Sequence, residues 1–404
     1  MQRNSKDRIR VMVVVGTRPE VIKVAPVIER LKRQPDDFET IIVATAQHRE
    51  LLDQALSLFH IRPDIDLDLM NSGQDLPTMT SRILERMSET LSTVKPDIVL
   101  VQGDTTTVFA GTLAAFYQHI PVAHIEAGLR SYNKYSPFPE EINRRLTTVM
   151  TDIHFAPTPL AKEALLNEGV AADGIVITGN TVVDALMHVS QLPFFFHNSV
   201  LGNVDLNKHR LVLVTSHRRE SWGLELQNIC EAIKELAQKH PDIVVVYPVH
   251  PNPVVKIIAN KILGGLDRIH LVGPLDYLTF INIMKKAYII LTDSGGLQEE
   301  APTLKKPLLL LRDVTERPEA FEAGLAKAIG TDRGRIVQEV DNLLNDDNVY
   351  RSMIDSYNPY GDGKAADRIV TALLRWANGK KPLLTPFVEF EPQAVEVDQL
   401  CQNQ

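Results

Sequence analysis

The chain has 404 residues and a mass of 45.2 kDa, and at about 150 residues per domain this length predicts two to three domains. Its 43 basic and 51 acidic residues give a formal net charge of −8, and hydrophobic residues make up 44% of the composition. These values exclude intrinsic disorder as the main state. They also disfavour nucleic acid and anionic membranes as partners, because both bind to basic surfaces.

Cysteine usage and the first residues of the chain indicate the compartment. Cys230 and Cys401 provide neither a disulfide framework nor metal-ligand spacing, which favours a reducing compartment and predicts no metal site. The apolar run at residues 11–15 is too short for the hydrophobic region of a signal peptide, and no run of 18 apolar residues occurs. We therefore expect a cytoplasmic, soluble protein without a membrane segment.

Short β-branched runs alternate with amphipathic stretches in the first half of the chain. The runs are apolar and bounded by Gly, Pro, Asp or polar residues, which predicts buried strands at 11–15, 41–45, 98–102, 122–126, 153–156 and 175–178. The stretch 21–33 has apolar residues at helical spacing. A repeated strand–helix order predicts a parallel sheet that is covered by helices on both faces.

The pattern stops at residues 190–209, which contain three consecutive phenylalanines and show no period, and we interpret them as a linker. It then resumes, with strands predicted at 211–215, 243–247, 269–272, 289–292 and 308–311. The sequence thus predicts two doubly wound Rossmann-like α/β domains, at 1–189 and 210–363. A helix at 364–378 and an acidic tail at 379–404 follow, and we expect the tail to be mobile or loosely docked.

Ligands of doubly wound sheets bind at the carboxyl ends of the strands, so we expect the site in a cleft between the two domains. After the run 11–15, Gly16 permits a close backbone approach, and exposed N–H groups together with Arg18 indicate an anion site. The alternative is a tight turn with a surface arginine.

A second anion site is predicted after the run 289–292. Ser294 is expected to cap a helix there, and Gly295 and Gly296 lie where that helix begins. Glu300, one turn further, could accept hydrogen bonds from two vicinal hydroxyl groups. The alternative is a capped helix whose acidic residues favour the positive end of the dipole. Two anion sites on separate domains could together hold a diphosphate.

Acidic side chains and one histidine follow other predicted strands. Asp104, Glu126 and Glu140 could act as acids or bases, and His217, beside two arginines, suits charge that develops on a leaving diphosphate. Structural roles are the alternatives. They are a helix cap for Asp104, pairing of Glu126 with Arg130, a helix start for Glu140 and a solvated charge cluster around His217.

Eleven motifs, in order from about residue 11 to about residue 376, together resemble the non-hydrolysing UDP-N-acetylglucosamine 2-epimerases. They are GTRPE (16–20), TAQHRE (45–50), GDTTT (103–107), EAGLRS (126–131), SPFPEE (136–141), ITGNTVVDAL (177–186), SHRRES (216–221), YPVH (247–250), LTDSGGLQEEAP (291–302), TERPEA (315–320) and NPYGDG (358–363). Only the first ten residues and the tail lie outside the match.

The resemblance implies the GT-B arrangement of two Rossmann-like domains, with the helix 364–378 packing back onto the first domain. It implies an isomerase that interconverts UDP-N-acetylglucosamine (UDP-GlcNAc) and UDP-N-acetylmannosamine (UDP-ManNAc) for cell-surface polysaccharide synthesis, without a cofactor. A homodimer and a second UDP-GlcNAc as activator are further implications.

The resemblance also assigns roles to residues by position. Asp104, Glu126, Glu140 and His217 match the catalytic set. The substrate-binding set is matched by Arg18, Lys23, Phe280, Ser294, Gly295, Gly296, Glu300 and Arg317. The activator site is matched by Gln47, His48, Gln74, Arg218 and His250. Ser216, Trp222 and Pro251 depart from the residues usual in the family.

These residue types suit elimination and re-addition of UDP. No carbonyl acidifies the C2 hydrogen of a sugar nucleotide, so a base would remove the proton while the C1–O bond breaks and cations stabilise the departing diphosphate. The sequence leaves open which carboxylate acts on which face of C2. The alternative functions are an epimerase of a UDP-2,3-diacetamido sugar, a GT-B glycosyltransferase and a catalytically silent sensor of nucleotide sugars.

Overall fold

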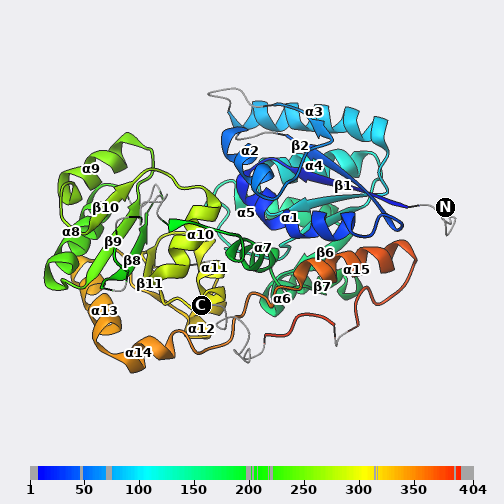
Figure 1. The fold of residues 1–404 in the computed structure, drawn as a ribbon. Coiled ribbons are helices and arrows are strands. Elements are labelled where there is room, and N and C mark those ends of the chain that lie inside the picture. The colour runs from blue at the N-terminus through cyan, green and yellow to red at the C-terminus, as the bar shows by residue number, and fades with distance from the viewer. Residues whose placement is uncertain are drawn as a thin grey trace. The chain divides into compact units, whose positions relative to one another are not determined.

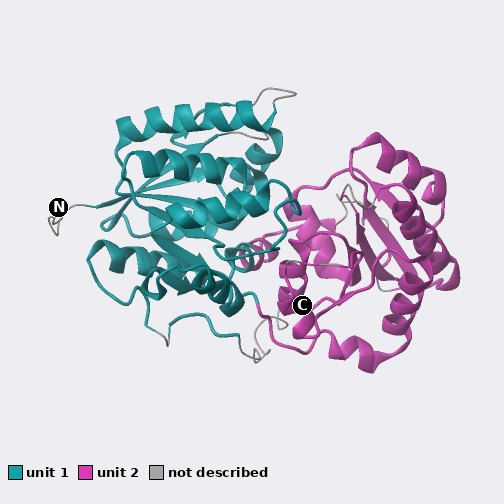
Figure 2. Ribbon diagram, turned by 180° about the vertical axis from the view of Figure 1, so that it is seen from behind, with its two compact units in different colours: residues 1–185, 360–392 teal, residues 186–359, 393–404 magenta. Residues whose placement is uncertain are grey.

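The structure is a computed structural model, and its described residues form two compact units (Figures 1 and 2). Unit 1 comprises the described residues up to 185 together with 360–392, and unit 2 comprises those from 186 to 359. The described residues are 8–45, 49–69, 75–196, 202, 204–206, 208–216, 218, 222–313, 315, 317–385 and 388–392.

Unit 1 is built on a seven-stranded parallel sheet of order β3-β2-β1-β4-β5-β6-β7. Its strands are β1 (Ile9–Val15), β2 (Phe38–Ala44), β3 (Ile65–Asp66), β4 (Ile98–Gln102), β5 (Val122–Ile125), β6 (Ile153–Ala156) and β7 (Ile175–Ile177). Its helices are α1 (Arg18–Lys32), α2 (Arg49–Leu58), α3 (Leu76–Val94), α4 (Thr106–Tyr117), α5 (Glu140–Met150), α6 (Pro159–Asn167), the short 3₁₀ helix η1 (Ala172–Gly174), α7 (Thr181–Ser190), which continues into unit 2, and α15 (Ala365–Ala377).

The core of unit 1 explains why its strands are almost uniformly apolar. Met12 and Val14 of β1 pack in one cluster with Ile83 and Met87 of α3 and with Val108 of α4. The other face of β1 is also buried, because helix α1 packs against it. The strand order reverses between β1 and β4, so the loops that follow these two strands diverge at this point of the sheet.

Unit 2 repeats this architecture with a six-stranded parallel sheet of order β10-β9-β8-β11-β12-β13. Its strands are β8 (Arg210–Thr215), β9 (Ile243–Pro248), β10 (Ile269–Val272), β11 (Ala287–Thr292), β12 (Leu308–Leu310) and β13 (Ala326–Ala328). Its helices are α8 (Leu224–Lys239), α9 (Pro253–Leu263), α10 (Tyr277–Lys286), α11 (Leu297–Thr303), α12 (Glu319–Glu322), α13 (Arg333–Asn345) and α14 (Asp347–Ser352). Here the order reverses between β8 and β11.

The α/β fold class predicted from the sequence is confirmed, and the structure adds two strands to it. Strand β3 has two residues and strand β13 has three, and both lie at sheet edges. Their sequences, ID and AKA, lack the run of large apolar residues that marks the equally short strands β7 (IVI) and β12 (LLL), which is why the sequence pattern missed them.

Helix α15 belongs to unit 1, although unit 2 separates it from the rest of that unit in the sequence. It packs against α1, and Asp184 accepts hydrogen bonds from the backbone N–H groups of Ala365 and Ala366 at the start of α15. Of the segment that follows, residues 379–385 and 388–392 are described, and Phe390 packs on unit 1. Phe390 is 2% exposed, and its N–H donates to the carbonyl of Ile177 in β7.

Among the described residues, no helix combines the length and the apolar character needed to cross a lipid bilayer.

Candidate active site

The turn between β1 and α1 is closed by a buried carboxylate. Glu20 accepts hydrogen bonds from the backbone N–H groups of Gly16 (2.5 Å) and Thr17 (3.2 Å). A Cβ on Gly16 would lie 2.2 Å from Oγ1 of Thr107, so only glycine fits here. Two of the N–H groups expected to bind an anion, those of Gly16 and Thr17, are therefore occupied by Glu20. At this turn, the half-buried side chain of Arg18 remains as the candidate anion ligand.

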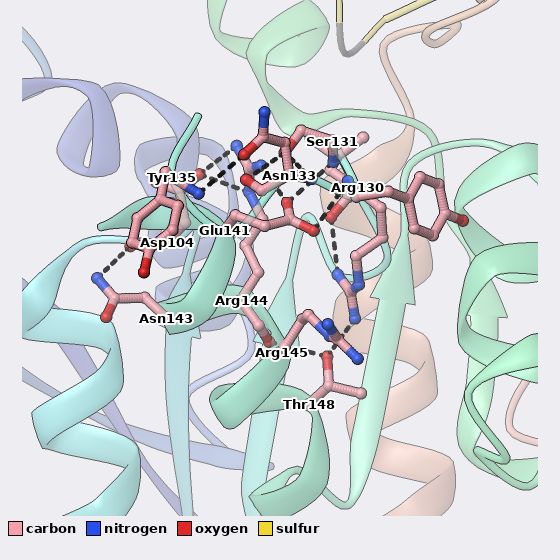
Figure 3. Close-up of polar contacts among 12 residues, drawn as sticks. Asp104, Arg130, Ser131, Asn133, Tyr135, Glu141, Asn143, Arg144, Arg145 and Thr148 are labelled. Carbon is pink, nitrogen blue, oxygen red and sulfur yellow. Dashed lines mark hydrogen bonds and ion pairs between the residues drawn. The ribbon is translucent and has the colours of Figure 1, made fainter. Parts of the chain in front are cut away.

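The loop that follows β4 places Asp104 beside α5, as Figure 3 shows. Nε and Nη2 of Arg144 contact Oδ2 of Asp104 at 2.8 and 2.7 Å, and Nδ2 of Asn143 donates to the Asp104 carbonyl at 2.9 Å. The other carboxylate oxygen, Oδ1, lies outside the pair with Arg144. The cap of α4 is Thr105, whose Oγ1 accepts from the N–H of Val108, so the alternative role of Asp104 as a cap is wrong.

Glu126 comes directly after β5 and has a left-handed backbone, with φ of 68°. This conformation costs a non-glycine residue of order 1–3 kcal/mol, and the surrounding structure must hold it in place. Nζ of Lys23 lies 2.5 Å from Oε2 of Glu126, and Nε2 of Gln102 donates to the same oxygen. Arg130 instead forms a two-bond pair with Glu168, so the alternative pairing of Glu126 with Arg130 is wrong.

Two glutamates begin α5. Glu140 is the first residue of the helix and is half-buried. The helix start expected at this position is therefore present, and it is compatible with a chemical role for the Glu140 side chain. Glu141 is 1% exposed, and it accepts hydrogen bonds from the N–H groups of Ser131 and Tyr132. Glu141 thus fixes the loop before α5 to the first turn of the helix (Figure 3).

A pair of buried histidines lies beneath this site. His124 of β5 and His154 of β6 are register partners. Nε2 of His124 lies 2.7 Å from the carbonyl oxygen of Gly103, and we assign the proton to this nitrogen because a carbonyl can only accept. Burial lowers the pKa of His124 to about 3, so the ring is neutral and holds the Gly103 carbonyl in place.

In unit 2, the glycine-rich segment after β11 leads into α11. The helix begins at Leu297 with Gly296 as its cap, so the expectation that Ser294 caps it is wrong. The N–H of Ser294 donates to Oγ1 of Thr292 at 2.9 Å, which tightens the turn. Gly295 lies between these positions and is buried.

Glu300, in the first turn of α11, is 7% exposed, and its Oε1 accepts a hydrogen bond from the Tyr277 hydroxyl at 2.8 Å. Tyr277 begins α10, whose half-buried Phe280 lies one turn further. Nε of Arg317 contacts Oε1 of the buried Glu299 at 2.6 Å. Glu299 thereby fixes the direction of the Arg317 side chain.

The segment after β8 is held by a second buried carboxylate, that of Asp293, much as the β1–α1 turn is held by Glu20. Asp293 is fully buried, and its Oδ2 accepts from Oγ of Ser216 (3.2 Å) and from the N–H of Arg218 (2.9 Å). Nδ1 of His250 accepts from the N–H of Asn252. This contact fixes the orientation of the His250 ring. Four predicted residues lie outside the described part of the chain: Gln47, His48, Gln74 and His217.

The predicted residues that the structure describes thus lie, in each unit, at or near the carboxyl ends of the strands. How the two groups of residues lie relative to each other stays a prediction. The structure also adds residues that the sequence analysis missed, namely Glu20, Glu141, Asn143, Arg144, Tyr277, Asp293 and Glu299. The spacing T-x-x-E at 17–20 is a capping-box signal, and Arg144 lies four residues after Glu140 on one helix face, so both had a local signature. Within the described ranges, no group of three or more His, Cys, Asp or Glu side chains is placed to hold a metal ion.

Comparison with known proteins decides the family. A model of the UDP-N-acetylglucosamine 2-epimerase family matches residues 29–374. The chain belongs to this family. The UDP-N-acetylglucosamine 2-epimerase of Bacillus subtilis is 51% identical over 367 residues, which cover 91% of this chain and 95% of that protein. The similarity to this relative therefore spans most of both sequences.

Two solved structures of similar fold carry bound nucleotides. The UDP-GlcNAc 2-epimerase of Neisseria meningitidis, bound to UDP-GlcNAc, has a TM-score of 0.84 and 46% identity, covering 91% of this chain and 100% of that one. A protein of S. aureus in complex with UDP has a TM-score of 0.85 and 47% identity, covering 92% and 97%. This member of the epimerase family thus shares its fold with proteins that bind a uridine nucleotide.

Proposed function

We propose that this chain converts UDP-GlcNAc to UDP-ManNAc reversibly, by elimination and re-addition of UDP. One observation carries the mechanism: Asp104 and Glu126 follow neighbouring strands, β4 and β5, and each is paired with a cation that fixes its direction. Membership of the epimerase family supports the overall reaction. The product would feed cell-surface polysaccharide synthesis in the cytoplasm, as the motif resemblance implies.

The reaction needs a base at C2 and stabilisation of positive charge near C1. As the C1–O bond breaks, its electron pair leaves with UDP, and the C2–H pair forms the double bond of a glycal-like intermediate. Carboxylates can accept the C2 proton and can stabilise the oxocarbenium-like transition state. Return of the proton to the opposite face, with re-addition of UDP at C1, gives the inverted sugar.

Asp104 and Glu126 have different surroundings that suit different roles. Asp104 is a quarter exposed at its side chain, and Oδ1 lies outside the contact with Arg144, which leaves an oxygen to approach the sugar. Glu126 is nearly buried, and both Lys23 and Gln102 contact its Oε2. We leave the assignment of faces open among Asp104, Glu126 and Glu140.

Unit 2 is proposed to hold the nucleotide. Glu300, held by Tyr277, would accept hydrogen bonds from the ribose hydroxyls, and Phe280 would contact the uracil. The backbone at 294–296 and the guanidinium of Arg317 would bind the diphosphate, whose developing charge they stabilise. His217 is proposed to act on the same leaving group.

A second nucleotide sugar is proposed as an activator, with Arg218 and His250 among its ligands. Arg218 is half-buried next to Asp293, whose contact with its N–H sets the position of the residue. The ring of His250 lies 6.3 Å from that of Trp222, so the departure from the family at residue 222 adjoins this site. Gln47, His48 and Gln74 complete the proposed set.

We also propose a homodimer formed through the C-terminal ends of α4 and α5. These two helices pack against each other in unit 1. Four large apolar side chains are exposed there: Phe116, Tyr117, Leu146 and Val149, the last of them 80% exposed. Apolar side chains grouped on adjacent helices are typical of a surface that is covered in an oligomer.

Incubation with UDP-GlcNAc alone in deuterated water tests the proposed reaction. We expect UDP-ManNAc that carries deuterium at C2, without added cofactor or acceptor, as seen by NMR and mass spectrometry. A glycosyltransferase would show no exchange without an acceptor, and a silent sensor would show none at all. A UDP-2,3-diacetamido sugar, tested in parallel, identifies the related epimerase if it alone reacts.

A further inference from the structure

The first two turns of α1 contact both strand ends that carry the proposed catalytic carboxylates. Glu20 and Lys23 are three residues apart and so lie on one face of the helix. Lys23 contacts Glu126 after β5, and Glu20 contacts Thr105, the residue that follows Asp104 after β4. Helix α1 thus holds two loops that are distant from it in the sequence.

Glu20 makes three hydrogen bonds while it is 2% exposed. Its Oε2 accepts from the N–H groups of Gly16 and Thr17, and its Oε1 accepts from Oγ1 of Thr105 at 2.5 Å. Burial is the main cause that raises the pKa of Glu20 to about 7. A buried carboxylate whose donors are neutral is costly for stability. The glutamate of a capping box on a water-exposed helix would accept the same backbone hydrogen bonds without the cost of burying a carboxylate.

The loop at 103–105 is held at every residue by a side chain from elsewhere in unit 1. His124 contacts the Gly103 carbonyl, Asn143 and Arg144 contact Asp104, and Glu20 contacts Thr105. Glu20 differs from the other holders, because the same carboxylate also binds the backbone immediately before Arg18. It therefore joins the backbone of the β1–α1 turn to that of the Asp104 loop.

We infer that Glu20 is a positioning residue for the reaction, which sets Asp104 relative to the Arg18 turn through its hydrogen bond with Thr105. The inference rests on the proposed function, since it assigns Asp104 to the chemistry. Misplacement of a reacting group by about 1 Å can lower a rate by about 10²-fold. Loss of the bond should therefore lower kcat, whereas the nucleotide-binding residues of unit 2 are untouched.

A double-mutant cycle on the full-length enzyme tests this. We expect Glu20→Ala and Thr105→Val each to lower kcat by about 10²-fold, with KM and the affinity for UDP changed less than about threefold. The loss in the double variant should be smaller than the product of the two single losses, because the bond between Glu20 and Thr105 is already absent from either single variant. Glu20→Ala also removes the bonds to Gly16 and Thr17, and Thr105→Val also removes the cap of α4. Thr105→Ser keeps the hydroxyl and should restore kcat to near that of the original enzyme.

Glu29→Ala is the matched control, because Glu29 is an exposed glutamate of the same helix and should leave kcat unchanged. Thermal unfolding of every variant shows whether it is folded. If Glu20→Ala does not fold, the comparison of Thr105→Val with Thr105→Ser decides. If the unaltered enzyme is active and the Thr105→Val variant keeps full kcat, the inference is overturned but the proposed function is not. The same holds if the loss of kcat in the double variant equals the product of the two single losses. An unaltered enzyme that forms no UDP-ManNAc overturns the proposed function as well.

Discussion

At the scale of single residues, the carboxylates of the two units differ in their neighbours. Asp104 is paired with Arg144 and keeps one oxygen outside that pair, whereas Glu300 accepts from a neutral tyrosine. A carboxylate next to a guanidinium is fixed in direction, which suits contact with a reacting centre. A carboxylate beside a hydroxyl can accept further hydroxyl donors, which suits recognition of a ribose. The proposed split between turnover and binding follows from this difference.

Asp104→Asn should abolish most turnover and leave nucleotide binding intact. The amide cannot act as a base, so we expect kcat to fall by about 10²–10⁴-fold. The dissociation constant of UDP, measured by calorimetry, should stay within about threefold. Asp53→Asn, an exposed position on α2, is the control and should leave both quantities unchanged.

Glu300→Ala should do the reverse. Loss of hydrogen bonds between hydroxyls and a buried charged group costs about 1.5–3 kcal/mol, which is roughly a 10- to 150-fold weaker affinity for UDP. Calorimetry with UDP measures this, and kcat at saturating substrate should change much less. Equal loss of UDP affinity in Glu300→Ala and Asp104→Asn would contradict the division of roles between the units.

At the scale of elements, each sheet carries a buried carboxylate at the point where its strand order reverses. Glu20 joins the loops after β1 and β4, and Asp293 joins the segments after β11 and β8. Loops at such a point diverge and have few backbone contacts with each other. A short carboxylate with several acceptor sites can hold two of them at once.

The buried histidine of strand β5, His124, predicts that the free energy of unfolding depends on pH. His124 has a pKa of about 3 when folded, against 6.5 for an ordinary histidine, so protonation favours the unfolded chain. Its contribution is complete above pH 6.5 and is lost progressively as the pH falls toward about 3. At pH 5 the loss is about 2 kcal/mol in the free energy of unfolding. Denaturant titrations at pH 7 and pH 5 should show that loss as the difference between the original protein and a variant without His124. The comparison is needed because the raised pKa of Glu20 changes the stability in the opposite sense over the same pH range.

His124→Gln should make the stability less sensitive to acid, because a glutamine amide can still donate to the Gly103 carbonyl and does not titrate. His188→Gln, at an exposed position on α7, is the control and should leave the acid sensitivity as it was. The same slope with pH in all three proteins would show that His124 is not the group that titrates.

At the scale of the whole molecule, the proposed dimer gives a direct prediction. Sedimentation or light scattering should give a mass about twice the 45.2 kDa of the chain. Val149→Asp on α5 should shift this mass toward that of one chain, because a charge cannot be buried in an apolar interface without large cost. Ile257→Asp on α9 is a matched control, also at an exposed apolar position, and should remain dimeric. A single-chain mass for the unaltered protein would overturn the proposal.

Much of the fold was predictable because it is encoded locally. A run such as Val11–Val15 is apolar throughout because both faces of a parallel sheet are covered by helices. Five consecutive residues are therefore enough to reveal the strand. The same holds for the capping box at Thr17 and Glu20 and for the motifs that resemble the family. The edge strands β3 and β13, with the sequences ID and AKA, contain no such pattern.

The sequence by itself determined the fold class, the family and the residue types of the site. Only the tertiary structure decided which side chains pair, since the partner of Glu126 is 103 residues away and that of Asp104 is 40 residues away. Periodicity and capping depend on neighbours within one or two turns, and so they can be read along the chain. Pairing across a sheet depends on the order of its strands and on how the helices pack against them, and no local pattern contains that information.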